Sequence, residues 1–543
     1  MHMINALDFG IRDGADITEK LCALLKQACA EEGEKTVVFE KGTYYISAEK
    51  CRKEKLVITN TVGEKEFSPD EEPHINEVPF YLENAEDLTL DGGDSVFIIS
   101  GKATNMAAVR CKNITVKNME IRHSHPDMHE LTVVSKSAFH VDFRIDSRSL
   151  YEVSNQTLYF YGDGYRCAAN KDAANAFWIG LVRLETPNKV KRVSHPLIGA
   201  WGAKEIKKGV VRFKYPSTLR FRKGDRFSIY DVRRQYAGIF LDRCENVTLE
   251  NIKQRFNYSL ALVAQSCENV NVNGVAFAPE QDCPVSLASA ADFIQICMCR
   301  GNININHSTF EGAGDDCLNV HGIHFKIVKK DGNKITVRFM HPQSYGFNPI
   351  KKGDTVAFID PKTLLESGRA EVLNSQMLSD YDLLLELDSA EKAVTGNVIE
   401  DVSACPNVDF GNNFINRIIT RGLLLTTRGK VRIHDNHFVS TTMSGILLSD
   451  DAKSWYESGM CTDVTIENNM FDYCGQTPIL IKPENSVHGG AVHRNITIKK
   501  NTFKKYKGVC IDAKSSDHIV IKDNSFARRK YLNTRNCTNV DGQ

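Results

Sequence analysis

A repeated six-residue phrase sets the strongest constraint on the fold of this 543-residue chain. The phrase is Cys-x-Asn-aliphatic-x-aliphatic, and it occurs at residues 111–116, 244–249 and 267–272, with looser copies later in the chain. Its first aliphatic positions recur at two spacings, a shorter one, as from Val247 to Val270, and a longer one, as from Val431 to Val464. Repeat units of roughly 20–50 residues are typical of solenoids, in which each unit packs only on its neighbours. We interpret the shorter spacing as a bare coil and the longer one as a coil with an added loop.

The later repeats share a second phrase, Asn-x-Phe, which begins five residues after the first aliphatic position. Coils of a parallel β-helix stack roughly 4.8 Å apart, so identical residues lie above one another. The phrase therefore predicts a ladder of asparagines at a turn and a stack of phenylalanines inside an all-β parallel β-helix. The pairs are Asn436/Phe438, Asn469/Phe471, Asn501/Phe503 and Asn524/Phe526.

The N-terminal segment differs from the repeats. Residues 16–19 form a helix start signal, and apolar residues follow at helical spacing from Ile17 to Ala28. Strand-like segments come next at 36–39 and 43–45. This order resembles the N-terminal cap of right-handed parallel β-helix enzymes of the pectate-lyase-like superfamily. We expect a helix that covers the otherwise open edge of the first coil.

Two gaps interrupt the repeat, one from Ile114 to Val247 and the other from Ile303 to Val408. Both are too long for one loop, and both contain a Lys-Gly-Asp phrase followed by an apolar strand, at 223–231 and 352–360. We interpret them as two related inserted β-barrels or sandwiches. The predicted domains are the cap and first coils (1–125), insert I (126–236), central coils (237–323), insert II (324–403) and C-terminal coils (404–543).

Asp315 and Asp316 follow Gly314 at the start of a strand-like segment. Since an unpaired buried carboxylate is costly, we expect a bend beside Gly314 to turn both acids outward. Alternation then points Leu318 and Val320 into the core. It leaves three side chains facing solvent, namely Cys317, Asn319 and His321. The plain alternative is that the two acids merely begin a turn.

A third carboxylate favours a catalytic role for these acids over the alternative that they merely begin a turn. Asp292 precedes Asp315 by one bare coil, so we expect it roughly 5 Å away along the helix axis. Glycosidic-bond hydrolysis needs one acid kept protonated, as neighbouring charge can do, and one base that activates water. We expect Asp292 in one role and Asp315 or Asp316 in the other. The sequence does not order them.

Several segments carry a family resemblance. Residues 291–301 and 314–322, together with 421–423, 427–428 and 455–466, are similar to the signature regions of glycoside hydrolase family 110, the exo-acting α-1,3-galactosidases. The likeness covers nearly the whole chain. It implies a cap, a right-handed β-helix and two β-barrel insertions.

The resemblance also implies an activity. The implied reaction is metal-independent hydrolysis with inversion that removes terminal α-1,3-linked galactose from blood-group-B-type or linear glycans. The family's three candidate catalytic acids map onto Asp292, Asp315 and Asp316. Gln295 stands where the family commonly has a histidine, which bears on substrate specificity more than on the reaction.

Further residues are candidates for substrate binding. Trp455 offers an apolar ring face to a galactose, or else it pins its own loop. Glu457 and Arg428 either hydrogen-bond sugar hydroxyls or fix loops. Asn319 and His321 are expected to face the cleft, with His321 contacting the substrate or holding the acids.

The sixteen cysteines do not predict disulfides or a metal site. Most of those in the repeats recur at one position, as a small buried filler does: Cys111, Cys244, Cys267, Cys299, Cys405 and Cys461. His123, His125 and His129 have no fourth ligand nearby, and we expect them in a solvated loop. No metal or cofactor is expected.

Composition excludes other partners. The 68 basic and 68 acidic side chains balance, so nothing indicates binding to nucleic acid or to an anionic membrane. No run approaches the ~20 apolar residues of a spanning helix. We expect a soluble protein with a carbohydrate partner, cytoplasmic as it stands or exported with its signal removed. The oligomeric state stays open, a homo-oligomer included.

Two competing functions remain. A polygalacturonase-like hydrolase would share the β-helix and a Gly-Asp-Asp-Cys-like step, but the chain lacks that group's Gly-His-Gly and Arg-Ile-Lys motifs. A non-catalytic glycan-binding β-helix is the second alternative. Three crowded acids argue against it, because a binding groove does not need them.

Overall fold

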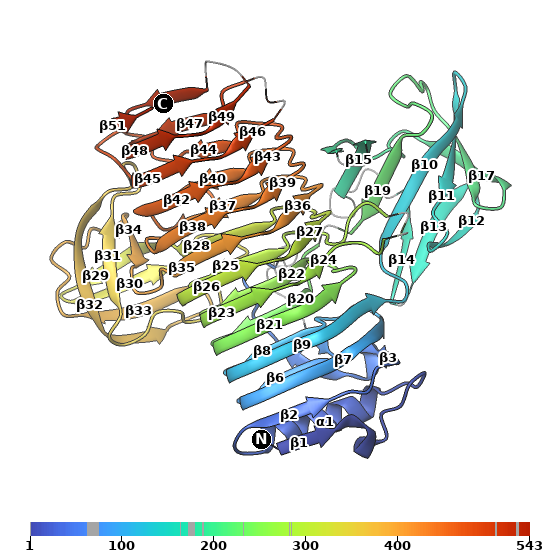
Figure 1. Cartoon of the computed structure of the whole chain (residues 1–543), viewed down its shortest axis with the longest axis horizontal. Helices are drawn as coiled ribbons and strands as arrows, with labels where there is room; N and C mark the ends of the chain where they lie inside the picture. The colour runs from blue at the N-terminus through green and yellow to red at the C-terminus, as the bar shows by residue number, and fades with distance from the viewer. Residues whose placement is uncertain are drawn as a thin grey trace.

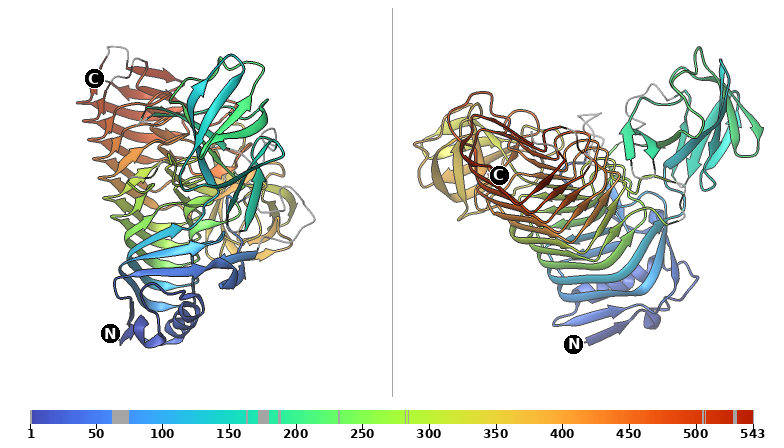
Figure 2. Two further views of the ribbon diagram at one scale, coloured as in Figure 1. Left: turned by 90° about the vertical axis from the view of Figure 1, so that its right-hand side faces the viewer. Right: turned by 45° about the horizontal axis from the view of Figure 1, so that its top comes forward.

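The structure is a computed structural model that describes residues 2–61, 75–162, 164–171, 180–186, 189–231, 233–281, 283, 285–504, 506, 508–527 and 531–542. It consists mostly of β-strands, which wind into one long parallel β-helix (Figure 1). The coils stack in sequence order, and the two termini lie at opposite ends of the column (Figure 2). The predicted parallel β-helix is confirmed.

A 21-stranded sheet forms two rows of the β-helix. The first row contains β1 (His2–Asn5), β2 (Lys35–Val38), β7 (Glu86–Ser100), β9 (Lys112–His123), β21 (Glu245–Gln254), β23 (Glu268–Asn273), β26 (Arg300–Asn306), β35 (Asn407–Gly411), β38 (Lys430–His434), β42 (Asp463–Glu467), β45 (His493–Lys499), β48 (Ser516–Lys522) and β51 (Thr538–Asp541). The second row contains β3 (Thr43–Ser47), β24 (Ala276–Phe277), β27 (Thr309–Glu311), β36 (Phe414–Asn416), β39 (His437–Phe438), β43 (Met470–Phe471), β46 (Thr502–Phe503) and β49 (Ser525–Phe526).

A 12-stranded sheet forms the remaining wall. Its parallel strands are β6 (Phe80–Glu83), β8 (Met106–Val109), β20 (Ala237–Asp242), β22 (Leu260–Gln265), β25 (Ile294–Cys297), β28 (Leu318–Ile323), β37 (Leu423–Leu425), β40 (Ile446–Leu448), β44 (Ile479–Ile481), β47 (Ile511–Lys514) and β50 (Leu532–Arg535). Strand β41 (Glu457–Ser458) pairs with the end of β28 in antiparallel fashion. This wall carries the predicted acids.

Stacked identical residues fill the coils as the repeat predicts. Phe438 stacks on Phe471 at 4.8 Å between ring centroids, and Phe471 on Phe503 at 5.1 Å. Buried asparagines run beside them: the Asn469 amide donates to Asn501 Oδ1 at 3.0 Å, while Asn469 Oδ1 accepts from the Asn436 amide at 2.9 Å. All sixteen cysteines are free thiols. The predicted ladder and stack are confirmed.

A single α-helix covers the N-terminal end of the coils in the part of the chain that the structure describes. Helix α1 (Thr18–Ala30) buries Leu21, Leu24 and Leu25 against the first coils. The Asp16 carboxylate accepts hydrogen bonds from the Thr18 backbone N at 3.0 Å and from Thr18 Oγ1 at 2.6 Å, which satisfies a free donor of the first turn. The predicted capping helix is confirmed. Beside it lie η1 (Ala6–Phe9), η2 (Ala48–Lys50) and the hairpin of β4 (Arg52–Lys55) and β5 (Ile75–Val78).

Insert II forms a closed six-stranded barrel with its own apolar core. Its strands are β29 (Phe325–Asp331), β30 (Lys334–Arg338), β31 (Thr355–Ile359), β32 (Glu366–Met377), β33 (Asp382–Leu387) and β34 (Val398–Asp401). The chain enters the barrel directly after β28, so the barrel is attached to the wall that carries the acids.

The described strands of insert I form two sheets, and barrel closure is seen only in insert II. A seven-stranded sheet contains β10 (Met128–Lys136), β11 (His140–Ile145), β15 (Gly180–Thr186), β16 (Lys189–Arg192), β17 (Trp201–Lys207), β18 (Val210–Lys214) and β19 (Arg226–Tyr230). A three-stranded sheet contains β12 (Leu150–Ser154), β13 (Thr157–Gly162) and β14 (Tyr165–Ala168). Both sheets contribute to one core. The two inserts stand on opposite sides of the coils (Figures 1 and 2).

The phrase shared by the inserts builds the same turn in both. Asp225 accepts a hydrogen bond from the Arg222 backbone N at 2.7 Å, and Asp354 accepts one from the Lys351 backbone N at 2.6 Å. The next residue starts β19 in insert I and β31 in insert II. This common turn supports the interpretation of the inserts as related.

Two of the three histidines near residue 125 do not lie in a solvated loop, so that expectation is wrong for them. His123 ends β9 with both ring nitrogens buried and its ring 4.8 Å from Tyr258, and His129 of β10 is buried and stacks on Phe160 at 3.9 Å. They pack where β9 leaves the coils for insert I. In the part of the chain that the structure describes, no helix is long and apolar enough to cross a membrane.

We predict that Asn469→Ala lowers stability by about 2–4 kcal/mol, because it leaves the amide groups of Asn436 and Asn501 without their buried partners. Thermal unfolding followed by circular dichroism measures the change. The matched control, Asn374→Ala on exposed barrel surface, should leave the melting temperature nearly unchanged. Equal melting temperatures for the two variants would show that the ladder contributes no stability.

Candidate active site

Strand pairing brings the predicted acids together. Asp292, Asp316 and Arg421 each lie two residues before a strand of the 12-stranded sheet, and the pairing joins Ile294 to Leu318 and Leu318 to Leu423. Asp292, Asp315 and Asp316 each place one carboxylate oxygen within 4.8 Å of the others. The three acids thus lie together on adjacent coils, as the coil spacing predicts.

The register differs from the predicted one by a residue. Asp292 stands level with Asp316 rather than with Asp315, because the coil between them is one residue longer than a bare coil. The backbone N of Asp316 accordingly donates to Asp292 Oδ1 at 3.3 Å. At Gly314 an added Cβ would lie only 2.3 Å from the Ala290 carbonyl oxygen, so glycine permits the close approach of the two coils.

Two arginines compensate the negative charge of the three acids. Arg234, which precedes β20, places Nη2 2.5 Å from Asp315 Oδ2 and Nη1 3.5 Å from Asp292 Oδ2. Arg421 places Nη2 2.8 Å from Asp316 Oδ2, and its Nε donates to Asp316 Oδ1 at 2.9 Å. Three carboxylates therefore share two guanidinium groups.

The acids differ in how well their charge is compensated. Asp316 also accepts hydrogen bonds from the Arg421 backbone N and from Thr420 Oγ1. Asp292 is 2 % exposed and has only the long contacts to Arg234 and to the Asp316 backbone among the described residues. The Asp315 side chain is 20 % exposed and meets Arg234 directly.

These environments separate the pKa values. Burial, followed by the charge of Asp315, raises the pKa of Asp292 well above its usual range. Burial alone would raise the pKa of Asp315 too, but Arg234 and then Arg421 outweigh it and lower that pKa. Near neutral pH this arrangement favours a protonated Asp292 beside an ionised Asp315.

Polar side chains of the same sheet lie next to the acids. Asn319 Nδ2 donates to Glu457 Oε1 at 2.9 Å, while the buried Asn319 Oδ1 has no hydrogen-bond partner among the described residues. The His321 Nδ1 lies 2.8 Å from the Gly322 carbonyl oxygen and therefore carries the proton, so Nε2 accepts from Gln295 Nε2 at 2.6 Å. We call this surface the polar wall; it combines an amide oxygen and a carboxylate that can bind hydroxyl groups.

The expected exposure of this strand is partly wrong. Cys317 is fully buried in the core of the coils, because it lies in the bend before β28, where strand alternation does not yet apply. Asn319 and His321 do point away from the coil interior, but each is only 4 % exposed. Strand β41, which pairs with the end of β28, places Glu457 against Asn319.

The segment that leads into β41 contains Trp455, which is 46 % exposed. Its ring stacks on His341 of insert II, at 4.3 Å between centroids. Arg428 lies elsewhere: it pairs with Glu400 at 2.7 Å and with Glu366 at 2.8 Å, both on barrel strands. Arg428 thus joins the barrel to the coils. This contact matches the alternative that Arg428 fixes a loop and does not bind sugar hydroxyls.

Sequence reasoning missed three contributors to the candidate site. Asn60, from the segment after β4, donates to Gln295 Oε1 at 2.8 Å, and nothing in its surroundings in the sequence indicates this role. Arg234 lies in the connection from insert I back to the coils and belongs to no repeat. Arg421, in contrast, follows Asp316 at the same spacing as Val408 follows Ile303, so repeat arithmetic could have found it.

The three acids are also a set that could hold a cation, since carboxylate oxygens are the ligands that hard metal ions prefer. Here the guanidinium groups of Arg234 and Arg421 already occupy the neighbouring positions.

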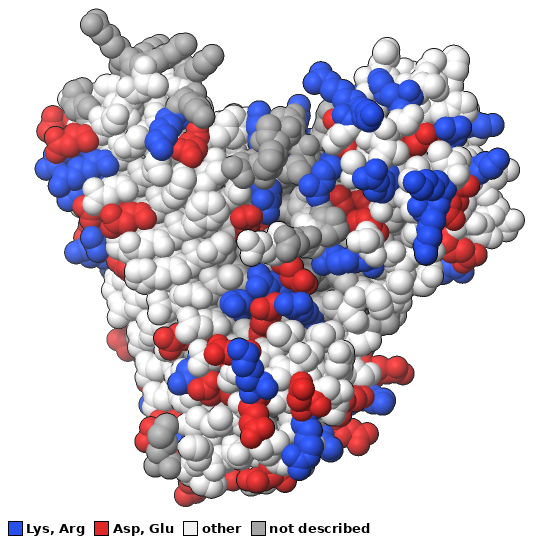
Figure 3. Space-filling view, turned by 45° about the vertical axis from the view of Figure 1, so that its right-hand side comes forward, with Lys and Arg blue, Asp and Glu red and all other residues white. Residues whose placement is uncertain are grey.

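In the space-filling view, basic and acidic side chains lie together in the hollow between the coils and insert I (Figure 3).

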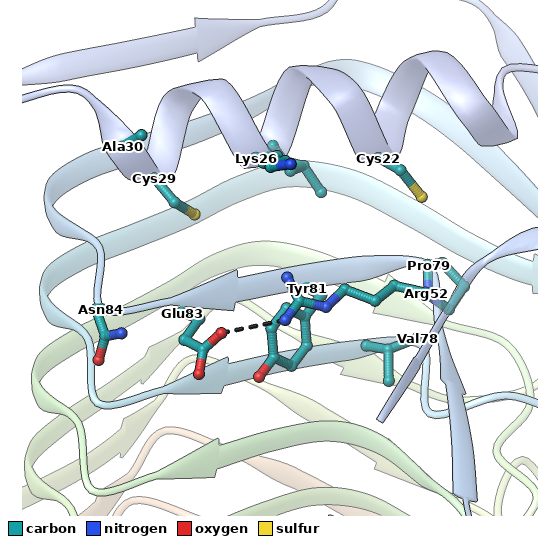
Figure 4. A pocket seen from close by; sticks show the side chains of 11 residues that line it. Cys22, Lys26, Cys29, Ala30, Arg52, Val78, Pro79, Tyr81, Glu83 and Asn84 are labelled. Carbon is teal, nitrogen blue, oxygen red and sulfur yellow. Dashed lines mark hydrogen bonds and ion pairs between the residues drawn. The ribbon is translucent and has the colours of Figure 1, made fainter. Parts of the chain in front are cut away.

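A separate pocket of about 230 Å³ lies at the capped end, between α1 and β6 (Figure 4). Arg52 lies over the Tyr81 ring at 4.1 Å and pairs with Glu83 at 3.2 Å. The carboxylate of Glu83 is thus paired with a cation. The pocket does not contain the three crowded acids. The acid cluster therefore remains the candidate active site.

Two family models match the chain. Residues 334–394 match the model described as the GLAA-B beta-barrel domain II, and residues 386–526 match the right handed beta helix region. Among solved structures, the exopolygalacturonase of Thermotoga maritima is similar with a TM-score of 0.42 and 11 % identity, over 99 % of this chain and 92 % of that one.

Two relatives are similar over nearly the full length. The chain is 33 % identical to alpha-1,3-galactosidase A of Bacteroides thetaiotaomicron, over 94 % of this chain and 89 % of the relative. It is 27 % identical to alpha-1,3-galactosidase B of Phocaeicola vulgatus, over 90 % of this chain and 83 % of the relative. Because the first of these relatives is more than 30 % identical over nearly the full length, and the barrel of insert II matches the GLAA-B model, the chain belongs to the α-1,3-galactosidases of glycoside hydrolase family 110.

Proposed function

We propose that the protein removes terminal α-1,3-linked galactose from glycans of the blood-group-B type or from linear α-galactosides. The observation that carries the proposal is the cluster of three carboxylates whose oxygens lie within 4.8 Å, in which burial favours a protonated Asp292 while Arg234 favours an ionised Asp315. Release of free galactose from an α-1,3-galactosyl oligosaccharide, followed by chromatography, tests the activity.

We assign the roles from the environments of the acids. Asp292, which is buried and weakly compensated, is the general acid that protonates the glycosidic oxygen. Asp315, ionised and the most exposed of the three, is the base that activates water. Asp316 holds Arg421 and positions the pair. This follows the general requirement for one protonated and one ionised carboxyl.

We propose that the galactose ring lies against the polar wall. Asn319 Oδ1 and Glu457 would accept hydrogen bonds from its hydroxyl groups. Trp455 would offer the ring face that His341 does not cover. Gln295 and His321 bond to each other beneath this surface and would set its shape.

Asp292→Asn should lower kcat by roughly 10²- to 10⁴-fold, because an amide cannot protonate the leaving oxygen. Asp316→Asn should lose activity to a similar extent, through misplacement of Arg421. Steady-state galactose release measures both. Asp463→Asn, an exposed aspartate on β42, is the matched control and should keep wild-type turnover. A folded Asp292→Asn enzyme with near-normal kcat would remove Asp292 from the mechanism.

The pH dependence of kcat/KM should have an acid limb set by Asp315 and an alkaline limb set by Asp292. Because Arg234 lowers the pKa of Asp315, Arg234→Gln should raise it and move the acid limb to higher pH by about one unit or more. Arg234→Lys should move it less. The exposed control Arg432→Gln should leave the profile in place. An unshifted acid limb in Arg234→Gln would contradict the assignment of Asp315.

We propose that hydrolysis inverts the anomeric configuration, which the family resemblance implies and which a water-activating Asp315 requires. The carboxylate oxygens lie within 4.8 Å, closer than the about 6.5–9.5 Å usual for inverting enzymes and nearer to the about 5–5.5 Å of retaining enzymes, so the stereochemistry tests the assigned roles. Proton NMR of the first-formed sugar decides: inversion releases β-galactose, whereas initial α-galactose would show retention.

We also propose that hydrolysis needs no metal, because guanidinium groups supply the positive charge at the acids. Dialysis against EDTA should leave the rate unchanged. A rate that falls after EDTA and returns with Ca²⁺ or Mg²⁺ would instead assign the three acids to a cation.

A further inference from the structure

We propose that a groove on insert II binds the saccharide chain on the far side of the scissile bond, so that the enzyme prefers galactose carried on longer oligosaccharides. This inference rests on the proposed function. The groove encloses about 560 Å³ and is lined by residues 338–342, 379, 381 and 382. Its size falls within the ~300–1,000 Å³ of small-ligand pockets. We call it the barrel groove.

The barrel groove adjoins the candidate active site. His341 lines the groove, and its ring stacks on Trp455, two residues before Glu457 of the polar wall. The loop after His341 is fastened beside the acids as well: the Asn60 backbone N donates to the Gln343 carbonyl oxygen at 2.7 Å, and the Asn60 amide reaches Gln295. A ligand that leaves the galactose position along Trp455 therefore reaches the groove.

The side chains of the barrel groove suit sugar rings. Tyr381 is 41 % exposed although one face of its ring packs on Tyr345 at 4.6 Å between centroids, so the ring is held rigidly. Exposed aromatic faces pack well on the apolar faces of pyranose rings. Opposite charges at the rim are paired, with Arg338 Nε 2.7 Å from Asp382 Oδ1. A paired rim favours a neutral oligosaccharide over a polyanion.

The backbone makes the groove a rigid part of the barrel. The Phe339 backbone N donates to the Tyr381 carbonyl oxygen at 2.9 Å, and the Gly346 backbone N donates to the Asp380 carbonyl oxygen at 2.7 Å. The two segments that form the groove are thus tied to each other before any ligand binds. Preorganisation of this kind lowers the entropy cost of binding.

The test compares α-1,3-galactosyl oligosaccharides of two to five sugar units with p-nitrophenyl α-galactoside, which carries no sugar beyond the scissile bond. For the wild type, kcat/KM should rise with chain length. Tyr381→Ala should lower kcat/KM about five- to tenfold on the longest substrate and leave the rate on the nitrophenyl substrate unchanged. Tyr45→Ala, at an equally exposed tyrosine on β3, is the matched control and should match the wild type.

A binding measurement separates this inference from the proposed function. The same oligosaccharide without its terminal galactose, titrated calorimetrically, should bind wild type and Tyr45→Ala alike and Tyr381→Ala about five- to tenfold more weakly. Equal affinity for all three proteins, or rates independent of chain length, would overturn the groove. Failure to release galactose from every α-galactoside would overturn the proposed function, whatever the titration shows.

Discussion

The parallel pairing of β25, β28 and β37 is the constraint on which the site depends. Each strand is preceded by a charged residue at the same position, so backbone hydrogen bonds that give the coils their stability also stack Asp292, Asp316 and Arg421. Like charges crowd there at a cost that only nearby cations offset. The buried core beneath them provides the stability that allows this crowding.

The two inserts add residues to the candidate site that the coils form. The connection leaving insert I supplies Arg234, which lies nearer to Asp315 than to Asp292 and therefore favours the ionised form of Asp315 more strongly. Insert II supplies His341 against Trp455, and Arg428 ties that barrel to the coils. A bare β-helix would present the acids on an open wall. The additions place a guanidinium group against these acids and an aromatic pair beside the polar wall.

The sequence predicted the repeating parts of the fold most completely. The β-helix, the asparagine ladder and the acid cluster follow from periodic spacing, because residues one coil apart stack on one another, while the cap follows from a local helix start signal and helical apolar spacing. The bare-coil spacing pairs Asp292 with Asp315, one residue from its true partner Asp316, because the coil that follows Asp292 is slightly longer than a bare coil. Strand alternation predicts an exposed Cys317, but this residue lies in a bend before the strand, where alternation does not hold. Arg234 and Asn60 reach the site through long-range contacts that no local pattern encodes.

A crystal structure of the Asp316→Asn protein with a bound α-1,3-galactosyl disaccharide would show which acid meets the scissile bond. If Asp292 is the general acid and Asp315 the base, the terminal galactose lies between the polar wall and Trp455, with the glycosidic oxygen within hydrogen-bond distance of Asp292 and a water held by Asp315. A galactose bound elsewhere, or a glycosidic oxygen out of reach of Asp292, would rule out these roles.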